Sequence, residues 1–158
     1  KMLKEVENYL LILNDLRNQV KNLLEKFPDE ALDWRPIEGE GDPATNSATI
    51  LVTHLAGSES IWIKEVIGGQ PIHRNRDAEF ITKGVAMAEL KRRLEGGDQN
   101  TKAILSSLTS AQLEESRKWQ DRRHTAYLFR IFNSSQSKFL SLISKKSSGN
   151  RMMRNKHV

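Results

Sequence analysis

The spacing of apolar residues at the start of the chain limits its fold more than any other feature of this sequence. Between residues 2 and 27 such residues recur every three or four positions, at Leu3, Val6, Leu10, Leu13, Leu16, Val20, Leu24 and Phe27. This spacing places them on one face of an α-helix, with Lys, Glu, Asn and Asp on the opposite face. Pro28 ends the helix, because proline lacks the amide hydrogen and disfavours helix in the residue before it.

A second helix is predicted to run to about Ile67, capped at its start by Ser47 or Asn46 and stopped by the pair Gly68–Gly69. Its inward stripe consists of Ile50, Leu51, His54, Leu55, Ser58, Ile61, Trp62 and Val66. Residues 28–46 and 69–85 are rich in turn-forming and charged residues, and we interpret both as long connections.

The second half of the chain predicts less regular helices. We expect a third helix over 86–108 with a break at Gly96 and Gly97, because each glycine weakens a helix by about 1 kcal/mol relative to alanine. A short helical turn over 110–116 follows, and then a last helix over 123–145, whose interrupted apolar stripe is typical of an incomplete helix. The pattern predicts an all-α, four-helix bundle with long crossover loops over 1–145, and a basic, disordered tail over 146–158.

Composition excludes several classes of protein. The chain contains no cysteine, which excludes disulfides, thiolate metal sites and a cysteine nucleophile. No stretch approaches the roughly 18 consecutive apolar residues that a membrane span requires, and no signal-peptide pattern is visible. We therefore expect a cytoplasmic protein with no membrane association.

Charge is distributed unevenly along the chain. Residues 1–116 hold 14 Lys and Arg against 19 Asp and Glu, whereas residues 117–158 hold 11 Lys and Arg against the single Asp121. Such a basic end could neutralise phosphates. However, base-stacking aromatics do not alternate with its basic residues in any recognisable module, and no helix-turn-helix or RNP pattern is present. The sequence therefore disfavours nucleic acid as a partner and favours a solvated tail.

His54 is the first candidate for chemistry, because the apolar period turns it toward the interior of the bundle. A buried imidazole requires partners for its ring nitrogens. It is interpreted either as a core histidine bonded to a loop or as a metal ligand.

The ordered set of segments around this helix resembles a known family. The segments are FPDEALDWRP at 27–36, ATNSATILVTHLAG at 44–57, Trp62, GGQPIHRNRDAEF at 68–80 and AEL at 88–90. In order and approximate spacing they are similar to the DinB/YfiT-like superfamily of four-helix-bundle, metal-dependent proteins, in the branch with a TNS…HLAG helix and an RDxEF loop.

The resemblance implies a bacillithiol- or mycothiol-type transferase or hydrolase that uses a thiol cosubstrate. In such proteins a divalent metal, here Zn or Ni, is held by one histidine of the second helix and an HxxxH pair of the last. His54 matches the first ligand, but the pair has no match, since the predicted last helix contains only His124. Either the chain has lost the metal, or its sequence after about residue 120 is frameshifted. Reading the other two frames of the coding DNA distinguishes these hypotheses.

The second connection contains a compact polar cluster at His73, Arg74, Arg76, Asp77 and Glu79. One interpretation is a solvated loop held by arginine–carboxylate pairs. In the other, Arg76 and Asp77 bind substrate, with Arg76 or Arg74 gripping a substrate carboxylate at the mouth of a pocket. Phe80 is interpreted as a packing anchor.

Two functions therefore remain open at this stage. The first is a metal-dependent thiol transferase or hydrolase, known by resemblance alone and with no catalytic residue identified. The alternative is a non-catalytic helical bundle that acts as an interaction or dimerisation module. The short apolar stripe of the last helix predicts a homodimer in either case.

Overall fold

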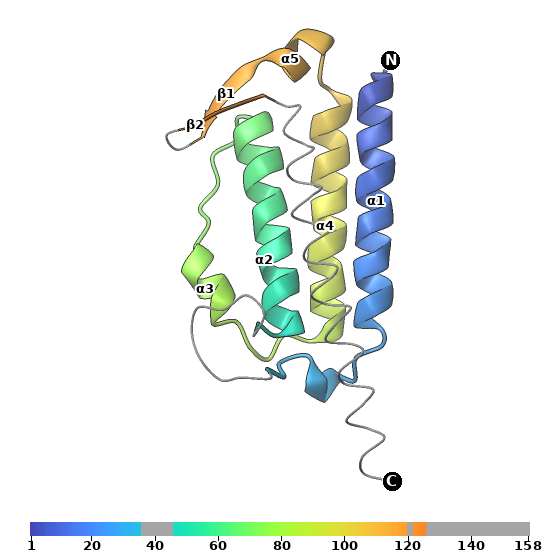
Figure 1. Cartoon of the computed structure of the whole chain (residues 1–158), viewed down its shortest axis with the longest axis vertical. Helices are drawn as coiled ribbons and strands as arrows, with labels where there is room; N and C mark the ends of the chain where they lie inside the picture. Colours follow the sequence, from blue (N-terminus) through green and yellow to red (C-terminus); the bar gives the residue numbers. More distant parts are fainter. Residues whose placement is uncertain (36–45, 120–121, 126–158) are drawn as a thin grey trace.

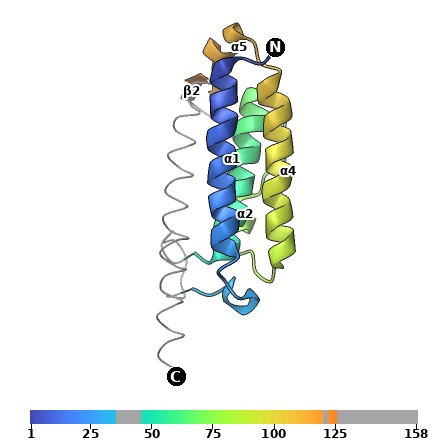
Figure 2. The ribbon, with the colours of Figure 1, turned by 90° about the vertical axis from the view of Figure 1, so that its right-hand side faces the viewer.

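The computed structural model describes residues 1–35, 46–119 and 122–125. Three long helices lie side by side in Figures 1 and 2, namely α1 (Lys4–Leu24), α2 (Ala48–Ser60) and α4 (Met87–Ser106). A π-helical segment, η3 (Ile61–Ile67), continues α2 directly. The shorter elements are η1 (Asp29–Ala31), α3 (Arg76–Phe80), α5 (Ser110–Glu114), β1 (Ser116–Trp119) and β2 (Arg122–Thr125). The prediction of a mainly helical bundle is confirmed.

Local signals set several of the helix ends as predicted. The Ser47 hydroxyl accepts a hydrogen bond from the Ile50 amide at 3.2 Å, which caps α2. Gly69 has a φ of +64° just after η3, a left-handed conformation that glycine adopts without steric cost. α1 ends at Leu24, before Pro28.

The predicted break at Gly96 and Gly97 is wrong, because α4 runs continuously through both residues. A Cβ atom at Gly97 would lie 3.1 Å from Glu59 Oε2, whereas one at Gly96 would meet nothing within 4 Å. Gly97 therefore gives the Glu59 side chain room against α4. Packing between α2 and α4 outweighs the low helix propensity of the two glycines.

The start of the predicted last helix is also wrong. Residues 122–125 form β2, which pairs antiparallel with β1 so that Lys118 lies opposite Arg123. In Figure 1 this hairpin and α5 lie at the end of the bundle where the chain begins. The remainder of the predicted last helix and the predicted tail over 146–158 lie outside the described residues.

The apolar core is divided into two clusters by a polar layer. One cluster holds Leu16, Val20, Leu24, Phe27, Leu32, Ala48, Leu51, Val52, Leu55, Leu90 and Leu94. The other holds Val6, Leu13, Ile63, Leu105, Leu108 and Leu113. Along α2 and η3, Glu59 falls between Leu55 of the first cluster and Ile63 of the second.

A buried polar layer is formed by Arg17, Glu59 and Thr101, with Asp98, whose side chain is 42% exposed, at its edge. The Arg17 guanidinium forms ion pairs with Glu59 and, at 2.6 Å, with Asp98. The Thr101 hydroxyl also donates to the Glu59 carboxylate. Arg17 and Glu59 are each 2% exposed. The layer therefore ties α1, α2 and α4 together at one level of the bundle.

Within the described residues no helix has the length and apolar character needed to cross a membrane.

Candidate functional site

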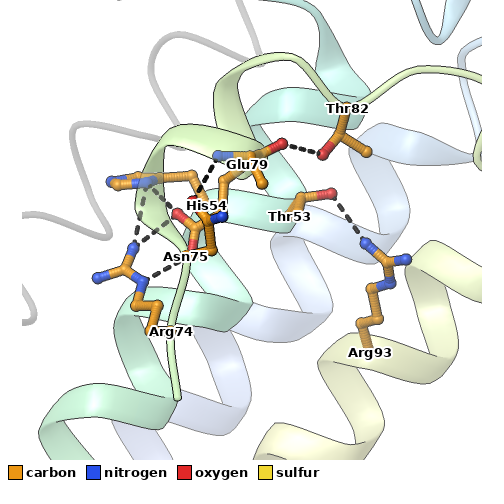
Figure 3. A network of polar contacts seen from close by, with 8 residues as sticks. Thr53, His54, Arg74, Asn75, Glu79, Thr82 and Arg93 are labelled. Carbon is orange, nitrogen blue, oxygen red and sulfur yellow. Dashed lines mark hydrogen bonds and ion pairs between the residues drawn. The ribbon is translucent and has the colours of Figure 1, made fainter.

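A second polar cluster surrounds His54, where α3 packs against α2. The His54 Nδ1 atom lies 2.7 Å from Glu79 Oε2. The two side chains are 13% and 9% exposed, so they lie at the border of the bundle interior rather than in the apolar core. Figure 3 shows His54, Arg74 and Glu79 pointing toward one another, whereas the neighbouring Thr53 points the other way, toward Arg93 on α4.

Arg74 clamps the carboxylate that contacts His54. Its Nε donates to Glu79 Oε1 at 2.6 Å, and its Nη2 donates to Oε2 at 2.7 Å. This two-pronged geometry fixes the plane of the carboxylate as well as its charge. The same Nη2 lies 3.3 Å from His54 Nδ1. Glu79 is thus held in place by Arg74 and in turn holds the imidazole.

Gly57 provides the space that this arrangement requires. A Cβ atom at this position would lie 2.1 Å from Glu79 Oε1 and 3.1 Å from Arg74 Nε. Only a residue without a side chain leaves room for the clamped carboxylate. The HLAG and RDAEF segments of the sequence are therefore two halves of one site, His54 and Gly57 coming from α2 and Glu79 from α3.

The short helix α3 is fixed by local hydrogen bonds. The Asn75 side chain caps it by accepting from the Ala78 amide at 3.0 Å, and the Thr82 hydroxyl donates to the Ala78 carbonyl at 2.9 Å (Figure 3). These bonds place Glu79 and Phe80 on the side of α3 that meets α2. The sequence predicts a connection over 69–85, so α3 is an element that the sequence did not reveal.

Burial lowers the pKa of His54 below its ordinary value of 6.5, against the opposing effect of its hydrogen bond to Glu79. The charges of Arg74 and Arg76 lower this pKa further. His54 is therefore neutral at pH 7. Because Nδ1 faces a carboxylate, we assign its one ring proton to Nδ1, so that Nε2 carries the lone pair. Nε2 is then the atom that can accept a proton or bind a metal.

Phe80 links His54 to Arg76. The Phe80 ring centroid is 4.8 Å from that of His54, and the Arg76 guanidinium carbon lies 4.8 Å from the Phe80 centroid. Arg76 and Asp77, the predicted substrate-binding pair, are both exposed on α3. Arg74, the other arginine considered for that role, is the one that contacts His54 directly.

The described residues do not form a metal site by themselves. Among them no group of three or more His, Asp or Glu side chains is placed to hold a metal ion. His54 Nδ1 is already engaged by Glu79, and the Arg74 charge lies beside it. A single imidazole does not hold Zn²⁺ or Ni²⁺, since structural and catalytic sites use three or four protein ligands. The prediction of a metal at His54 therefore depends on ligands from outside the described residues.

The sequence and the fold agree with one family. The DinB superfamily matches residues 12–132, and the chain belongs to that superfamily. Among solved structures, it is similar to the colibactin self-resistance protein ClbS, crystallised in complex with double-stranded DNA. The two share 19% sequence identity with a TM-score of 0.63, over 92% of this chain and 95% of ClbS. A comparison with curated proteins found no match.

This comparison corrects one of the predictions made from the sequence. We disfavoured nucleic acid as a partner because no stacking module, helix-turn-helix or RNP pattern is present. That argument is contradicted by ClbS, a protein of similar fold solved bound to DNA. The absence of a familiar motif is therefore no argument against DNA binding by a bundle of this kind.

Proposed function

We propose that this chain is a transferase or hydrolase of the kind that its resemblance implies, with a thiol or water as the nucleophile and His54 as the proton acceptor. The observation that supports this role is the hydrogen bond between His54 Nδ1 and the Glu79 carboxylate, which Arg74 holds with two hydrogen bonds of its own. Such a partner fixes the tautomer and the ring orientation, so that Nε2 is presented as the base.

The residues of the site suit each proton transfer that this reaction needs. Nε2 takes the proton of the thiol or water, which becomes the attacking nucleophile. The resulting imidazolium keeps its Nδ1–H bond to Glu79, whose negative charge stabilises it. When the electrophile loses its leaving group, Nε2 returns the proton to that group, and His54 is neutral again. Because the pKa of His54 is lowered, the base is in its active form at neutral pH.

The proposed base acts without a metal, because a metal bound at His54 Nε2 would occupy the lone pair that accepts the proton. If Zn or Ni binds as the resemblance implies, it supplies a Lewis acid that lowers the pKa of the thiol or water. His54 Nε2 is the ligand that the described residues offer, with Glu79 as the hydrogen-bonded support that metal-binding histidines commonly have. The remaining ligands would have to come from other residues.

The experiment compares His54→Gln with His73→Gln, which removes an exposed histidine from the neighbouring loop. Activity is measured as the transfer of small thiols to 1-chloro-2,4-dinitrobenzene, which releases chloride. The content of Zn, Ni and Mn per chain is measured in the same samples. We expect the first variant to lose about a hundredfold or more in rate, the usual contribution of a general base, and the second to lose nothing. If the wild type and His54→Gln react at the same rate with every thiol and ester of a panel, the alternative, a non-catalytic interaction module, is supported.

A second candidate function, binding of duplex DNA, is favoured by the likeness to ClbS and by the charge of the β1–β2 hairpin. Residues 116–125 contain four Lys and Arg, at positions 117, 118, 122 and 123, against Asp121. Antiparallel pairing brings both strands of this basic segment together, with Arg117 opposite His124 and Lys118 opposite Arg123. A two-stranded ribbon has the dimensions that the major groove admits, and its basic residues would neutralise phosphates.

Fluorescence anisotropy with a 20-base-pair duplex tests this candidate at several salt concentrations. The variant Arg122→Ala/Arg123→Ala is compared with Lys91→Ala/Arg92→Ala, which removes the same charge from α4. We expect weaker binding for the hairpin variant and a salt dependence shallower by about one to two units of slope, since each lost phosphate contact contributes about 0.9. Identical binding curves for the two variants would exclude the hairpin as the DNA contact.

A further inference from the structure

Arg76 is placed beside the His54 site but takes no part in its hydrogen bonds. Its guanidinium carbon lies 4.8 Å from the centroid of the Phe80 ring, and that ring also lies beside His54. The hydrogen bonds and ion pairs found between described residues include none from Arg76. Its side chain is exposed. The guanidinium is therefore held in position by an aromatic face while its N–H groups remain directed to solvent.

The charges around the site make this position attractive to an anion. Arg74 neutralises Glu79 through its two hydrogen bonds, and His54 is uncharged at pH 7. The charge of Arg76 is not balanced in this way. Asp77 follows it in the chain, yet no ion pair between the two is found in the described part of α3. A positive charge thus remains at the edge of the proposed base.

We propose that Arg76 and Phe80 form a binding subsite for a carboxylate group of the substrate. This inference rests on the proposed function, and it restricts the substrate to small molecules that carry a carboxylate near the reacting atom. A guanidinium that stacks on a ring uses its face, so its edge can still form two parallel hydrogen bonds with a carboxylate. An amine or a neutral substrate would gain nothing from this arrangement.

Phe80 determines where the bound carboxylate lies relative to the base. Its ring contacts both the Arg76 guanidinium and the His54 imidazole. An anion held by Arg76 therefore lies within the length of one small molecule of His54 Nε2. Because α3 is fixed by the Asn75 cap and the Thr82 hydrogen bond, this spacing belongs to the folded protein and does not depend on the ligand.

Acetate is the probe for the test, titrated into the full chain at constant ionic strength set with sodium chloride. Binding is followed by the NMR signals of the Arg76 side-chain Nε–H and of the amides of residues 74–81. We expect saturable shifts in the wild type and an affinity at least about tenfold weaker in Arg76→Gln, the loss of one strong charge-assisted contact. Arg76→Lys, which keeps the charge but not the planar fork, is expected to fall between the two.

Two further variants separate the subsite from general effects of charge. Phe80→Leu keeps every charge and is expected to weaken acetate binding, because the guanidinium loses its aromatic support. Arg92→Gln removes an exposed arginine from α4 and is expected to leave the affinity unchanged. An Arg76→Gln affinity equal to that of the wild type, or an equal loss in Arg92→Gln, would overturn the proposal.

The same titration distinguishes failure of the subsite from failure of the proposed base. His54→Gln is expected to bind acetate as the wild type does, because Arg76 makes the contact. If that variant binds acetate but retains full transfer activity, the subsite stands and the base is wrong. If the base is confirmed and acetate does not bind, the subsite is wrong.

Discussion

The two polar clusters of this molecule use similar residues in different surroundings. The buried polar layer places Arg17 against Glu59, and the His54 site places Arg74 against Glu79. Three long helices enclose the first pair, whose side chains are 3% and 2% exposed. The second pair lies between α2 and the short helix α3, with side chains 13% and 9% exposed.

The difference indicates what each cluster can do. The Arg17 and Glu59 side chains are directed at each other inside the core, and the layer reaches the surface at Asp98, whose side chain is 42% exposed. The His54 site adds an imidazole with a lowered pKa and a neighbouring arginine that faces solvent. We therefore interpret the first cluster as a device that aligns the helices and the second as the place for chemistry. Five predictions test this division.

The largest expected effect follows from Arg17→Met, which leaves the buried Glu59 carboxylate without its cation. Removing one partner of a buried ion pair typically costs about 3–5 kcal/mol, because an uncompensated charge stays in the core. Urea unfolding measures this loss. The double variant Arg17→Met/Glu59→Met is expected to recover much of the stability, since an apolar pair of similar volume can replace a buried ion pair.

Arg74→Met is the matched change at the other site, where the ion pair is less deeply buried, with side chains 13% and 9% exposed. We expect a clearly smaller loss of stability there than for Arg17→Met, together with a change in the His54 resonances. Equal losses at the two sites would show that they do not differ in the way that we propose.

The long helices could be predicted because their signals are local. The three- and four-residue spacing in α1 and the Ser47 cap of α2 lie in short stretches of sequence. The continuity of α4 could not be predicted, since the residue that explains Gly97 is Glu59 on another helix. Arg17 was missed for the same reason. A charged residue beside an apolar stripe is normally assigned to the solvent face, and only its distant partners make it a buried residue.

The next largest effect is expected from Gly57→Ala. Its Cβ would lie 2.1 Å from Glu79 Oε1, so the carboxylate must leave the position in which Arg74 clamps it. We expect a loss of about 1–3 kcal/mol from the disturbed polar contacts and a fall in the proposed activity toward that of His54→Gln. If Gly57→Ala keeps full activity, the Glu79 clamp is not needed to position His54.

The sequence predicted several residues of the His54 site, but it did not predict which of them contact one another. The sequence singled out His54 and the cluster at residues 73–79, because an inward histidine and a run of charged residues are visible in one dimension. Which arginine meets His54 depends on the turn into α3, and that turn is set by the Asn75 cap. Gly57 carried a usable signal, since a glycine inside a helix often marks a close approach by another group.

A smaller effect is expected from the two glycines of α4. Gly96→Ala is expected to stabilise the protein by about 0.5–1 kcal/mol, because alanine is the better helix former and its Cβ would meet nothing. Gly97→Ala is expected to gain less or to destabilise, because its Cβ would press on the buried Glu59 carboxylate. Urea unfolding of the two variants measures the difference. Equal gains would mean that Glu59 can move away from α4, and that the polar layer is looser than its contacts indicate.

The smallest effect is a dependence of stability on pH that belongs to the His54 site. In the unfolded chain His54 has its ordinary pKa of 6.5, and in the folded protein this pKa is lower because the ring is buried. Between these two pKa values the unfolded state therefore binds a proton more readily than the folded state. The stability that neutral His54 contributes is fully present above pH 6.5 and is lost as the pH falls through the lower pKa of the folded protein. Urea midpoints at pH 7.5, 6.5 and 5.5, in protein treated with EDTA, are expected to fall less steeply in His54→Gln than in the wild type. His73→Gln serves as the control that removes one exposed histidine. Parallel curves for His54→Gln and the wild type would show that folding does not lower the pKa of His54.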